Sequence, residues 1–190
     1  SQTVRERITS YYARDSVVIH PPVDTHKFHL SPSPKTYFLA GGRLVAYKRF
    51  DLIVEAANRT GLPVKIFGTG PVAAALKARA RPNVQFLGRV SDTEKAKLYA
   101  DALAFLHPHE EDFGITAVES MAAGRPVIAW RRGGAMETVV EGVTGAFMDE
   151  QSWEELADLL IRFESDHYDP HVILKHAQQF SRDVFKERLQ

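Results

Sequence analysis

Short apolar runs alternate with amphipathic helical patterns along this chain. The apolar runs predicted to be strands cover residues 16–19, 37–40, 63–67, 84–87, 102–106, 127–130 and 146–148. They are too short and too apolar to have one face in water, as expected of strands that helices cover on both sides. The alternation therefore predicts an α/β fold built on a doubly wound parallel sheet of about seven strands with right-handed crossovers.

The helical patterns carry their own start and stop signals. Predicted helices cover residues 3–12, 50–60, 71–81, 91–100, 115–122, 135–140, 153–163, 170–180 and 182–189, and residues 22–34 are predicted to be a loop. Ser91 with Glu94, and Ser152 with Glu155, have the spacing of a capping box. Pro71 suits the first position of the helix that follows it.

The segment 107–130 is where we expect the chemistry. A strand stops at His107-Pro108, a carboxylate-rich loop leads through Phe113-Gly114 into a helix, and Pro126 precedes the next strand. In an open parallel α/β sheet, ligands bind in the crevice outside the carboxyl ends of the strands. This predicts a site near Glu111, Phe113, Gly114 and Glu119.

Composition describes a single ordinary globular domain. The 190 residues are 44% hydrophobic and 25% charged, which allows a proper core. We expect a linker helix in residues 1–14, the sheet with its helices in 15–164 and two crossing helices in 165–190. Lys plus Arg and Asp plus Glu both number 24, so no global field favours nucleic acid, and any anion site must be local.

The chain has no cysteine, which excludes disulfides and thiolate chemistry. No apolar stretch reaches membrane-spanning length and no signal-peptide pattern is present, so the cytoplasm is the expected compartment. The chain starts at Ser1 within a helical pattern, which indicates a fragment of something longer.

Glu111 and Glu119 are seven residues apart, which by itself is a weak signal. Thr116 and Glu119 also have the spacing of a capping box, and the pattern alone favours this structural role for Glu119. Residues 110–112 carry three adjacent carboxylates, which repel one another unless a cation or a hydroxyl-rich ligand compensates their charge. Their position after a strand favours a ligand over a merely solvated loop.

A metal site is disfavoured. His107 and His109 form a His-x-His pair, but we find no third ligand at a useful spacing, and Pro108 stiffens the pair. The chain also has no Asp-x-Asp, the carboxylate pair with which some sugar-transfer folds hold a divalent cation on a diphosphate. Lysine, arginine and helix ends must then neutralise any phosphate.

Arg43 and Lys48 are the cations best placed for that task. They flank the first strand-to-helix turn, where Gly41-Gly42 allows close approach of a ligand to the backbone. Two solvated surface cations are the equally simple alternative. The helix N-terminus at Ile115 and Thr116 adds free N–H groups and a favourable dipole, so a diphosphate cradle is a reasonable hypothesis.

Gly68-Thr69-Gly70 after a strand fits part of the dinucleotide fingerprint, so a nicotinamide site is weighed against this hypothesis. The motif does not follow the first strand, and Pro71 removes an N–H group that would face a pyrophosphate. The next strand ends in Gly88-Arg89 instead of an acidic ribose ligand. We interpret the segment as a turn whose glycines permit tight packing.

Taken together, segments 18–24, 42–48, 66–71, 84–90, 111–126 and 133–145 resemble the motifs of group 1 (GT4-type) retaining glycosyltransferases. The resemblance is to the C-terminal, donor-binding half of their two-domain GT-B fold, which is Rossmann-like. The six motifs are collinear and cover nearly the whole chain, and they reverse the preference for a capping role of Glu119.

The resemblance implies a role for each matching residue. Glu119 would accept the ribose hydroxyls of the nucleotide, and the backbone at Arg89 and Val90 would border the base. Arg43 and Lys48 would hold the donor diphosphate, and Glu111 would contact the transferred sugar or its developing positive charge. The backbone N–H groups at Phe113, Gly114, Ile115 and Thr116 would face sugar and phosphate.

The resemblance also implies a retaining, metal-independent transfer without a cofactor, in which a donor phosphate oxygen helps to deprotonate the acceptor. A covalent double displacement through Glu111 is the mechanistic alternative. The N-terminal acceptor domain is absent from this chain, so we expect weak donor binding, almost no transfer, and self-association through an exposed apolar patch. Peripheral membrane association would reside mainly in the missing half.

Three further functions remain open on the sequence alone. One is a non-catalytic module that binds a nucleotide sugar, the second is an NAD-dependent oxidoreductase domain, and the third is an epimerase of GT-B type. The donor base can be uracil, guanine or adenine, and Lys48-Arg49 favours GDP-mannose weakly because it resembles bacterial mannosyltransferases.

Overall fold

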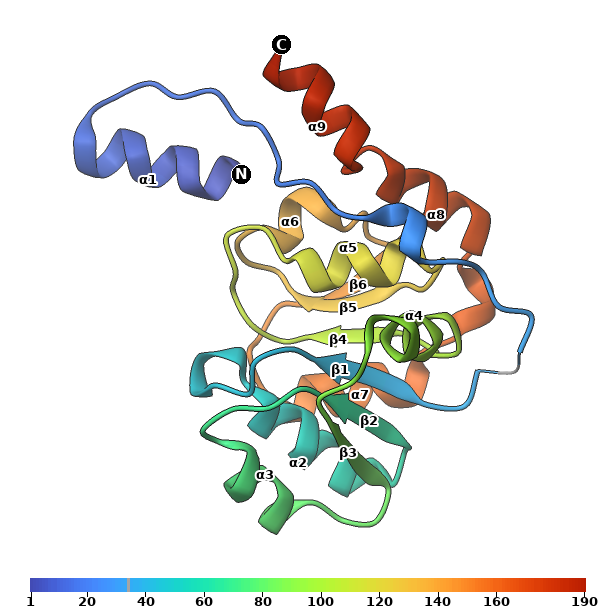
Figure 1. Cartoon of the computed structure of the whole chain (residues 1–190). Helices are drawn as coiled ribbons and strands as arrows, with labels where there is room; N and C mark the ends of the chain where they lie inside the picture. Colours follow the sequence, from blue (N-terminus) through green and yellow to red (C-terminus); the bar gives the residue numbers. More distant parts are fainter. Residues whose placement is uncertain (34) are drawn as a thin grey trace.

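A six-stranded parallel sheet forms the centre of the molecule (Figure 1). The computed structural model describes residues 1–33 and 35–190. The strand order is β3-β2-β1-β4-β5-β6, and every neighbouring pair is parallel. The strands are β1 (Phe38–Gly41), β2 (Val64–Phe67), β3 (Val84–Gly88), β4 (Phe105–His107), β5 (Val127–Trp130) and β6 (Gly145–Met148). The predicted doubly wound, Rossmann-like sheet is therefore confirmed.

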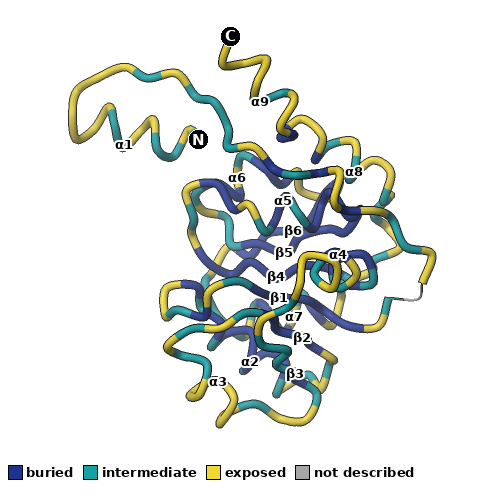
Figure 2. Tube along the Cα trace, in the orientation of Figure 1, coloured by how far each residue is buried: buried dark blue, intermediate teal, exposed yellow. Residues whose placement is uncertain are grey.

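Helices cover both faces of the sheet and create two cores. On one face lie α2 (Phe50–Thr60), α3 (Ala73–Arg79) and α7 (Trp153–Arg162); on the other lie α4 (Asp92–Ala100), α5 (Ile115–Ala122) and α8 (Pro170–Gln178). Strand β1 shows the consequence of alternation, because Phe38 and Ala40 join one core and Leu39 joins the other. Figure 2 shows most of the strands and the inner helix faces as the buried part of the chain, while the edge strand β3 is only partly buried.

The strand order reverses between β1 and β4, which are adjacent in the sheet but not in the sequence. The loops that leave these two strands therefore diverge from neighbouring points at the carboxyl edge. Ligand crevices of open α/β sheets form at such a switch point. The loop after β1 contains the short 3-10 helix Ala46–Lys48, and the loop after β4 contains Glu111.

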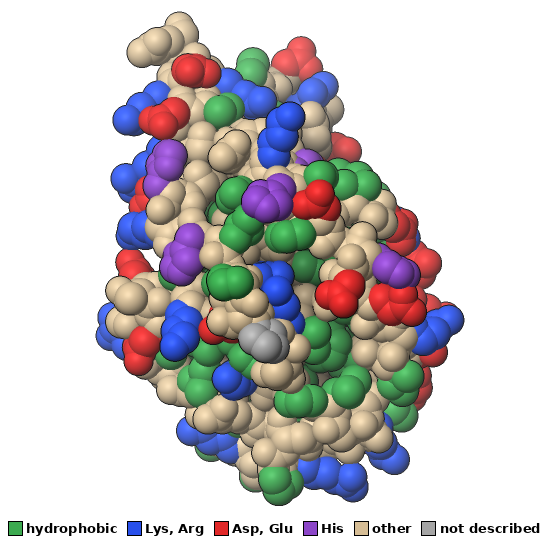
Figure 3. Space-filling view, turned by 90° about the vertical axis from the view of Figure 1, so that its right-hand side faces the viewer, with side chains coloured by type: hydrophobic (Ala, Val, Ile, Leu, Met, Phe, Trp, Pro, Cys, Tyr) green, Lys and Arg blue, Asp and Glu red, His purple; other side chains and the backbone are tan. Residues whose placement is uncertain are grey.

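Figure 3 shows one face of the molecule, on which Lys and Arg side chains are interspersed with Asp and Glu and with hydrophobic side chains. This distribution agrees with the balance of 24 basic and 24 acidic residues.

The N-terminal helix α1 (Gln2–Tyr12) lies away from the sheet and contributes no buried residue (Figure 1). The carboxylate of Glu137, in the short helix α6 (Ala135–Thr138), accepts hydrogen bonds from the backbone N–H groups of Gln2 and Thr3 at 2.8 and 3.1 Å. The same carboxylate lies 3.1 Å from His20 Nε2. Glu137 thus ties the start of α1 and the following loop to the domain, with the C-terminal helix α9 (Arg182–Leu189) on the same side (Figure 1).

The strand predicted over residues 16–19 is wrong, so the sheet has six strands instead of seven. Val17 is 88% exposed, and among the described residues no strand lies alongside this segment. A β-branched run becomes a strand only where a neighbouring strand or a core face receives it. The chain first pairs at Val23, in an isolated bridge to Ser181. Within the predicted 22–34 loop, Thr25–Lys27 forms a 3-10 turn, and residue 34 lies outside the described residues.

Helix ends follow the predicted signals in some places and not in others. The Ser91 and Glu94 capping box is present. At Ser152 only half of the box forms, because the Glu155 carboxylate accepts from Asp149 and Glu150 N–H groups instead. Other differences are in extent. Helix α3 is Ala73–Arg79 where residues 71–81 were predicted, α8 ends at Gln178 instead of residue 180, and α6 ends at Thr138 because residue 139 is extended. Strand β4 is Phe105–His107 where residues 102–106 were predicted.

Among the described residues, no helix combines the length and the apolar character that crossing a membrane requires.

Candidate functional site

The loop 108–114 is fixed to the domain by long-range contacts. Gly134 donates its N–H group to the carbonyl of Glu111 at 2.7 Å, and a methyl group at Gly134 would collide with the backbone of Phe113. Gln151 donates to the carbonyl of Pro108 at 2.9 Å. A glycine is needed at residue 134 because the two chain segments approach so closely. The Gly133-Gly134 pair thus positions the carboxylate loop.

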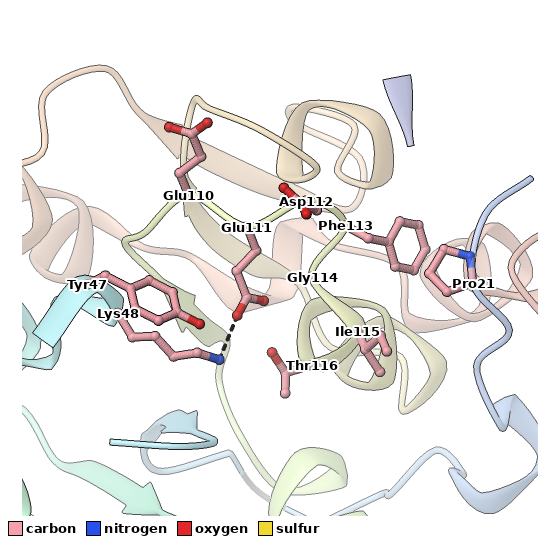
Figure 4. Close-up of a pocket in the computed structure, with 10 residues that line it drawn as sticks. All are labelled: Pro21, Tyr47, Lys48, Glu110, Glu111, Asp112, Phe113, Gly114, Ile115 and Thr116. Atoms are coloured by element: carbon pink, nitrogen blue, oxygen red, sulfur yellow. Dashed lines mark ion pairs between the residues drawn. The ribbon is translucent and has the colours of Figure 1, made fainter. Parts of the chain in front are cut away.

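The Lys48 ammonium group lies 2.6 Å from Glu111 Oε1 and links the loop after β1 to the loop after β4 (Figure 4). The two side chains are only 10% and 19% exposed, so water screens their charges poorly. Burial raises the pKa of Glu111, but contacts with His109 and Lys48 outweigh it and lower the pKa to about 2. Glu111 is therefore an ionised carboxylate at neutral pH.

A pocket of about 510 Å³ opens around this ion pair. Figure 4 shows Lys48 and Glu111 pointing toward each other, while the Phe113 ring is turned toward Pro21. Phe113 stacks on His20 and packs against Phe180, so only its backbone belongs to the site. The lining residues are Pro21, Tyr47, Lys48, Glu110, Glu111, Asp112, Phe113, Gly114, Ile115 and Thr116.

The first turn of α5 forms one wall of this pocket. Gly114 is the N-cap residue, and the N–H groups of Ile115 and Thr116 have no partner inside the helix. The buried Thr116 hydroxyl also has no hydrogen-bond partner among the described residues. These donors, together with the helix dipole, favour a negatively charged ligand group.

Glu119 lies one turn further along α5, beside a second hollow of about 180 Å³. Lys95 of α4 donates to Glu119 Oε1 at 2.8 Å, and the Tyr99 hydroxyl donates to Glu119 Oε2 at 3.2 Å. Thr116 lies inside the helix and not at its cap, which rules out the capping box with Glu119. Glu119 is instead a carboxylate held between two helices, with 13% of its side chain exposed.

Arg43, Arg89 and Val90 line a third hollow, of about 640 Å³, which Lys95 also borders. Arg43 therefore does not share a pocket with Lys48, although the two were predicted to act on the same diphosphate. Lys95 belongs to both the second and the third hollow, and Ile115 belongs to both the first and the second. The three hollows thus follow one another along the carboxyl edge of the sheet.

The glycine turn after β2 packs tightly, as predicted. Gly68 has a φ of +108°, and a methyl group there would collide with the carbonyl of Gly42. A methyl group at Gly70 would collide in the same way with the backbone of Leu44. The glycines therefore allow the loops after β1 and β2 to touch, and this packing role accounts for both residues.

The two histidines of the loop are buried next to Glu111, and this corrects the sequence analysis. His107, His109 and Glu111 each offer one potential ligand atom, and these three atoms all lie within 4.8 Å of one another. Glu111 is therefore the third potential metal ligand that the spacing did not indicate. Burial lowers the pKa of His107 to about 3 and lowers the pKa of His109 as well. Both imidazoles are therefore neutral at physiological pH, the form that ligates metals.

Lys95 and Tyr99 are the site residues that the sequence analysis missed. They are four residues apart on α4, so their side chains lie on the same face of that helix. Tyr99 is fully buried. This burial is the main reason why the pKa of its hydroxyl is raised well above the usual value, and the nearby Glu119 carboxylate is the second reason. The signal available in the sequence was the spacing of a lysine and a tyrosine four residues apart, which places two polar groups on one helix face.

The chain matches the family described as glycosyl transferases group 1 over residues 23–182. It is 36% identical over 117 residues to D-rhamnosyltransferase WbpZ of Pseudomonas aeruginosa, with 57% of this chain and 31% of that protein covered. It is 32% identical over 190 residues to a GDP-mannose-dependent alpha-(1-6)-phosphatidylinositol monomannoside mannosyltransferase of Mycobacterium tuberculosis, with 83% and 49% covered. The chain thus spans less than half the length of each of these relatives.

Among solved structures, Anabaena HepE in complex with UDP superimposes on the whole chain with a TM-score of 0.83 at 22% identity, and 60% of that protein is covered. This likeness concerns the fold. Together with the family match over residues 23–182, it shows that the chain belongs to the group 1 glycosyltransferases and has the fold of their C-terminal, donor-binding half.

Proposed function

We propose that this domain binds a nucleoside-diphosphate sugar along the three hollows. We further propose that the full-length protein transfers the sugar, with retention, to a glycan or a lipid-linked acceptor. The observation that carries the proposal is the position of the first turn of α5 between two ion pairs. Lys48 pairs with Glu111 on one side, and Lys95 pairs with Glu119 on the other. A diphosphate with a ribose on one side and a sugar on the other suits this order of groups.

In this proposal the nucleoside occupies the second and third hollows. Glu119 accepts hydrogen bonds from the ribose hydroxyls, and Lys95 and Tyr99 keep its carboxylate in position. A hydrogen bond to a charged group contributes about 1.5–3 kcal/mol. The backbone at Arg89 and Val90 borders the base, in the hollow that Arg43 also lines.

The diphosphate lies at the N-terminus of α5. Lys48 and Arg43 approach it from the loop after β1, and the N–H groups of Ile115 and Thr116 donate to it. The poorly screened Lys48 charge stabilises the negative charge that develops on the leaving diphosphate. This arrangement supplies charge neutralisation from the chain itself, in keeping with transfer that needs no metal or other cofactor.

Glu111 faces the transferred sugar, with Phe113 and Gly114 beside it. The bond between the anomeric carbon and the diphosphate oxygen breaks, and the ionised Glu111 stabilises the oxocarbenium-like charge on the sugar. The acceptor hydroxyl attacks from the same face and gives its proton to a donor phosphate oxygen. Trapping a sugar on Glu111 would favour the covalent alternative instead.

The donor sugar and the partner domain belong to the same proposal. A relative named as GDP-mannose-dependent favours GDP-mannose, whereas HepE was solved with UDP, so both bases enter the test. The acceptor site requires an N-terminal domain, and we expect no measurable transfer by the 190-residue chain alone. Tyr11 and Tyr12, 78% and 73% exposed, belong to the surface through which the isolated chain would self-associate.

The test is a calorimetric titration of the purified chain with UDP, GDP, ADP and NAD. Arg43→Ala and Glu119→Gln are titrated in parallel, with Glu154→Gln as the control because Glu154 is an exposed carboxylate on α7. We expect saturable binding of one nucleoside diphosphate, weakened in the first two variants and unchanged in the control. Binding of NAD alone would overturn the proposal.

If the isolated chain binds none of these ligands, the same titration is carried out on the full-length protein, where closure of the second domain completes the pocket. There, absence of binding by all three nucleoside diphosphates would refute the donor site.

A further inference from the structure

His107, His109 and Glu111 are spaced every second residue from the last position of β4. Strand β4 ends at His107, the chain bends at residue 109, and Glu110 is exposed. The conformation of this loop therefore brings the two imidazoles and the Glu111 carboxylate together, although Pro108 separates the histidines.

The geometry of the three side chains is compact. The two imidazole ring centroids are 4.0 Å apart, and His109 Nε2 lies 3.5 Å from Glu111 Oε1, which is longer than a normal hydrogen bond. All four imidazole nitrogens are buried and have no hydrogen-bond partner among the described residues. Buried polar atoms are nearly always paired in folded proteins, so four unpaired nitrogens at one point call for a ligand.

We propose that His107, His109 and Glu111 form a binding site for a late first-row transition-metal ion such as Zn²⁺, and that the bound ion inhibits sugar transfer. Two imidazoles and a carboxylate are a typical donor set for zinc, with a fourth position left to water. Zinc binds these ligand types at about 2.0–2.2 Å, so the three atoms must draw closer than their present spread. Glu111, the partly exposed member, rotates to close that distance.

The ion reaches the site from the 510 Å³ pocket, because His107 is fully buried and Glu111 lines the pocket wall. Tyr47 also lines this pocket and is 61% exposed, and its ring centroid lies 6.2 Å from that of His109. A path therefore leads from solvent past Tyr47 to the Glu111 carboxylate and on to the imidazoles.

Lys48 competes with the ion, because its ammonium group already lies 2.6 Å from Glu111 Oε1. Two cations repel each other at this range, so the ion must displace Lys48 from the carboxylate. Removing the lysine charge should therefore tighten metal binding, whereas removing a histidine should weaken it. Opposite signs for two neighbouring substitutions distinguish this site from casual binding at surface histidines.

Inhibition rests on the proposed function, in which Glu111 faces the transferred sugar. An ion held by Glu111 takes that carboxylate away from the sugar and places a positive charge where positive charge develops during transfer. The metal site itself does not depend on the donor assignment, because none of its three ligands has to bind nucleotide.

The experiment is a calorimetric titration of the chelator-treated 190-residue chain with Zn²⁺ in the absence of nucleotide, followed by Co²⁺ absorption spectroscopy. The variants are His109→Gln, Glu111→Gln and Lys48→Met, with His167→Gln as the control, since His167 lies at an exposed position far from the loop in sequence. Thermal unfolding of each variant establishes that it is folded.

We expect one saturable site with a tetrahedral Co²⁺ spectrum. Affinity should fall at least about tenfold in His109→Gln and Glu111→Gln, because each loses one of three ligands. It should rise in Lys48→Met and stay unchanged in His167→Gln.

Two results would overturn the metal site. One is the absence of saturable binding by the wild-type chain, and the other is binding that depends on His167 but not on His109. If His109→Gln does not fold, Lys48→Met becomes the deciding variant. Zn²⁺ binding by Lys48→Met that is no tighter than binding by the wild type would then contradict the site. Failure here leaves the nucleoside diphosphate titration unaffected, so the metal site and the donor site are tested separately.

Discussion

The site has two corners that resemble each other in composition and differ in how they are built. In the Glu119 corner, formed by Lys95, Tyr99 and Glu119, both carboxylate oxygens have protein donors at 2.8 and 3.2 Å. All three residues belong to helices, α4 and α5, that pack side by side. This corner is complete without a ligand and holds one carboxylate in a fixed position.

In the Glu111 corner, formed by Lys48, His109 and Glu111, all three residues lie in loops or a short 3-10 turn. Lys48 approaches Glu111 to 2.6 Å, but the His109 nitrogens remain unpaired among the described residues. The difference teaches that the Glu119 corner is preorganised for one kind of hydrogen-bonding partner. The Glu111 corner has donors and acceptors still free to take a sugar or an ion.

The largest expected effect separates the corners by reaction step. Glu111→Gln in the full-length protein should reduce the rate of transfer by about 10²–10³-fold, because the neutral amide no longer stabilises positive charge on the sugar. Nucleoside diphosphate binding should change little, since Glu119 is untouched. Steady-state kinetics beside calorimetry measures both quantities.

Retained transfer in Glu111→Gln would mean that the transfer step does not need this carboxylate. Equal loss of transfer and nucleotide binding would remove the functional distinction between the corners.

The second expected effect concerns the nucleotide alone. Glu119→Gln should weaken binding of the preferred nucleoside diphosphate by about 10- to 100-fold, because a charged acceptor worth about 1.5–3 kcal/mol is lost. Calorimetric titration gives the ratio of the dissociation constants, with Glu154→Gln as a charge-matched control. Unchanged affinity in Glu119→Gln would remove the ribose from this corner.

The third expected effect tests the support of the Glu111 corner. Gly134→Ala should lower the free energy of unfolding by about 1–3 kcal/mol, because the added methyl group meets the Phe113 backbone and pushes the carboxylate loop outward. Gly142→Ala is the comparison: a methyl group there meets no atom within 4 Å, so its cost comes from the positive φ of +73° alone and not from a collision. Urea unfolding measures both variants.

Gly134→Ala should reduce transfer more than it reduces nucleoside diphosphate binding, because Glu119 is held by helix α4 and not by the carboxylate loop. A variant as stable as the wild type would show that the loop tolerates the methyl group.

The smallest expected effect lies in the Glu119 corner. Tyr99→Phe removes one donor to Glu119 while keeping the ring, and should lower stability by about 0.5–1.5 kcal/mol and nucleotide affinity a few-fold. Tyr37→Phe loses a comparable bond, to the carbonyl of Leu98, and should affect stability without affecting the nucleotide. Equal nucleotide affinities in the two variants would contradict a positioning role for Tyr99.

The sequence predicted the fold well because periodic patterns are local. The apolar runs at 37–40, 63–67 and 127–130 became β1, β2 and β5 with shifts of one residue or less, and the helix beginning at Ile115 has its predicted end at Ala122. The run 16–19 has the same β-branched character, yet it forms no strand, because no neighbouring strand receives it. Local preference thus predicts strands only where the fold supplies a partner.

The site was predicted in part. Glu111, Phe113, Gly114, Ile115 and Thr116 are neighbours in the sequence, so one motif found them together. Lys48 meets Glu111 only because the strand order brings β1 next to β4, and nothing in the spacing of the two residues indicates it.

The sequence by itself determined the alternating elements, the neutral charge balance and the carboxylate loop at the end of a strand. These depend on side-chain character over a few residues. The tertiary structure alone decided that Lys95 and Tyr99 hold Glu119, that Arg43 and Lys48 line different hollows, and that two buried imidazoles lie next to Glu111. Burial and pairing of polar groups depend on which distant segments pack together, and that order is a property of the whole sheet.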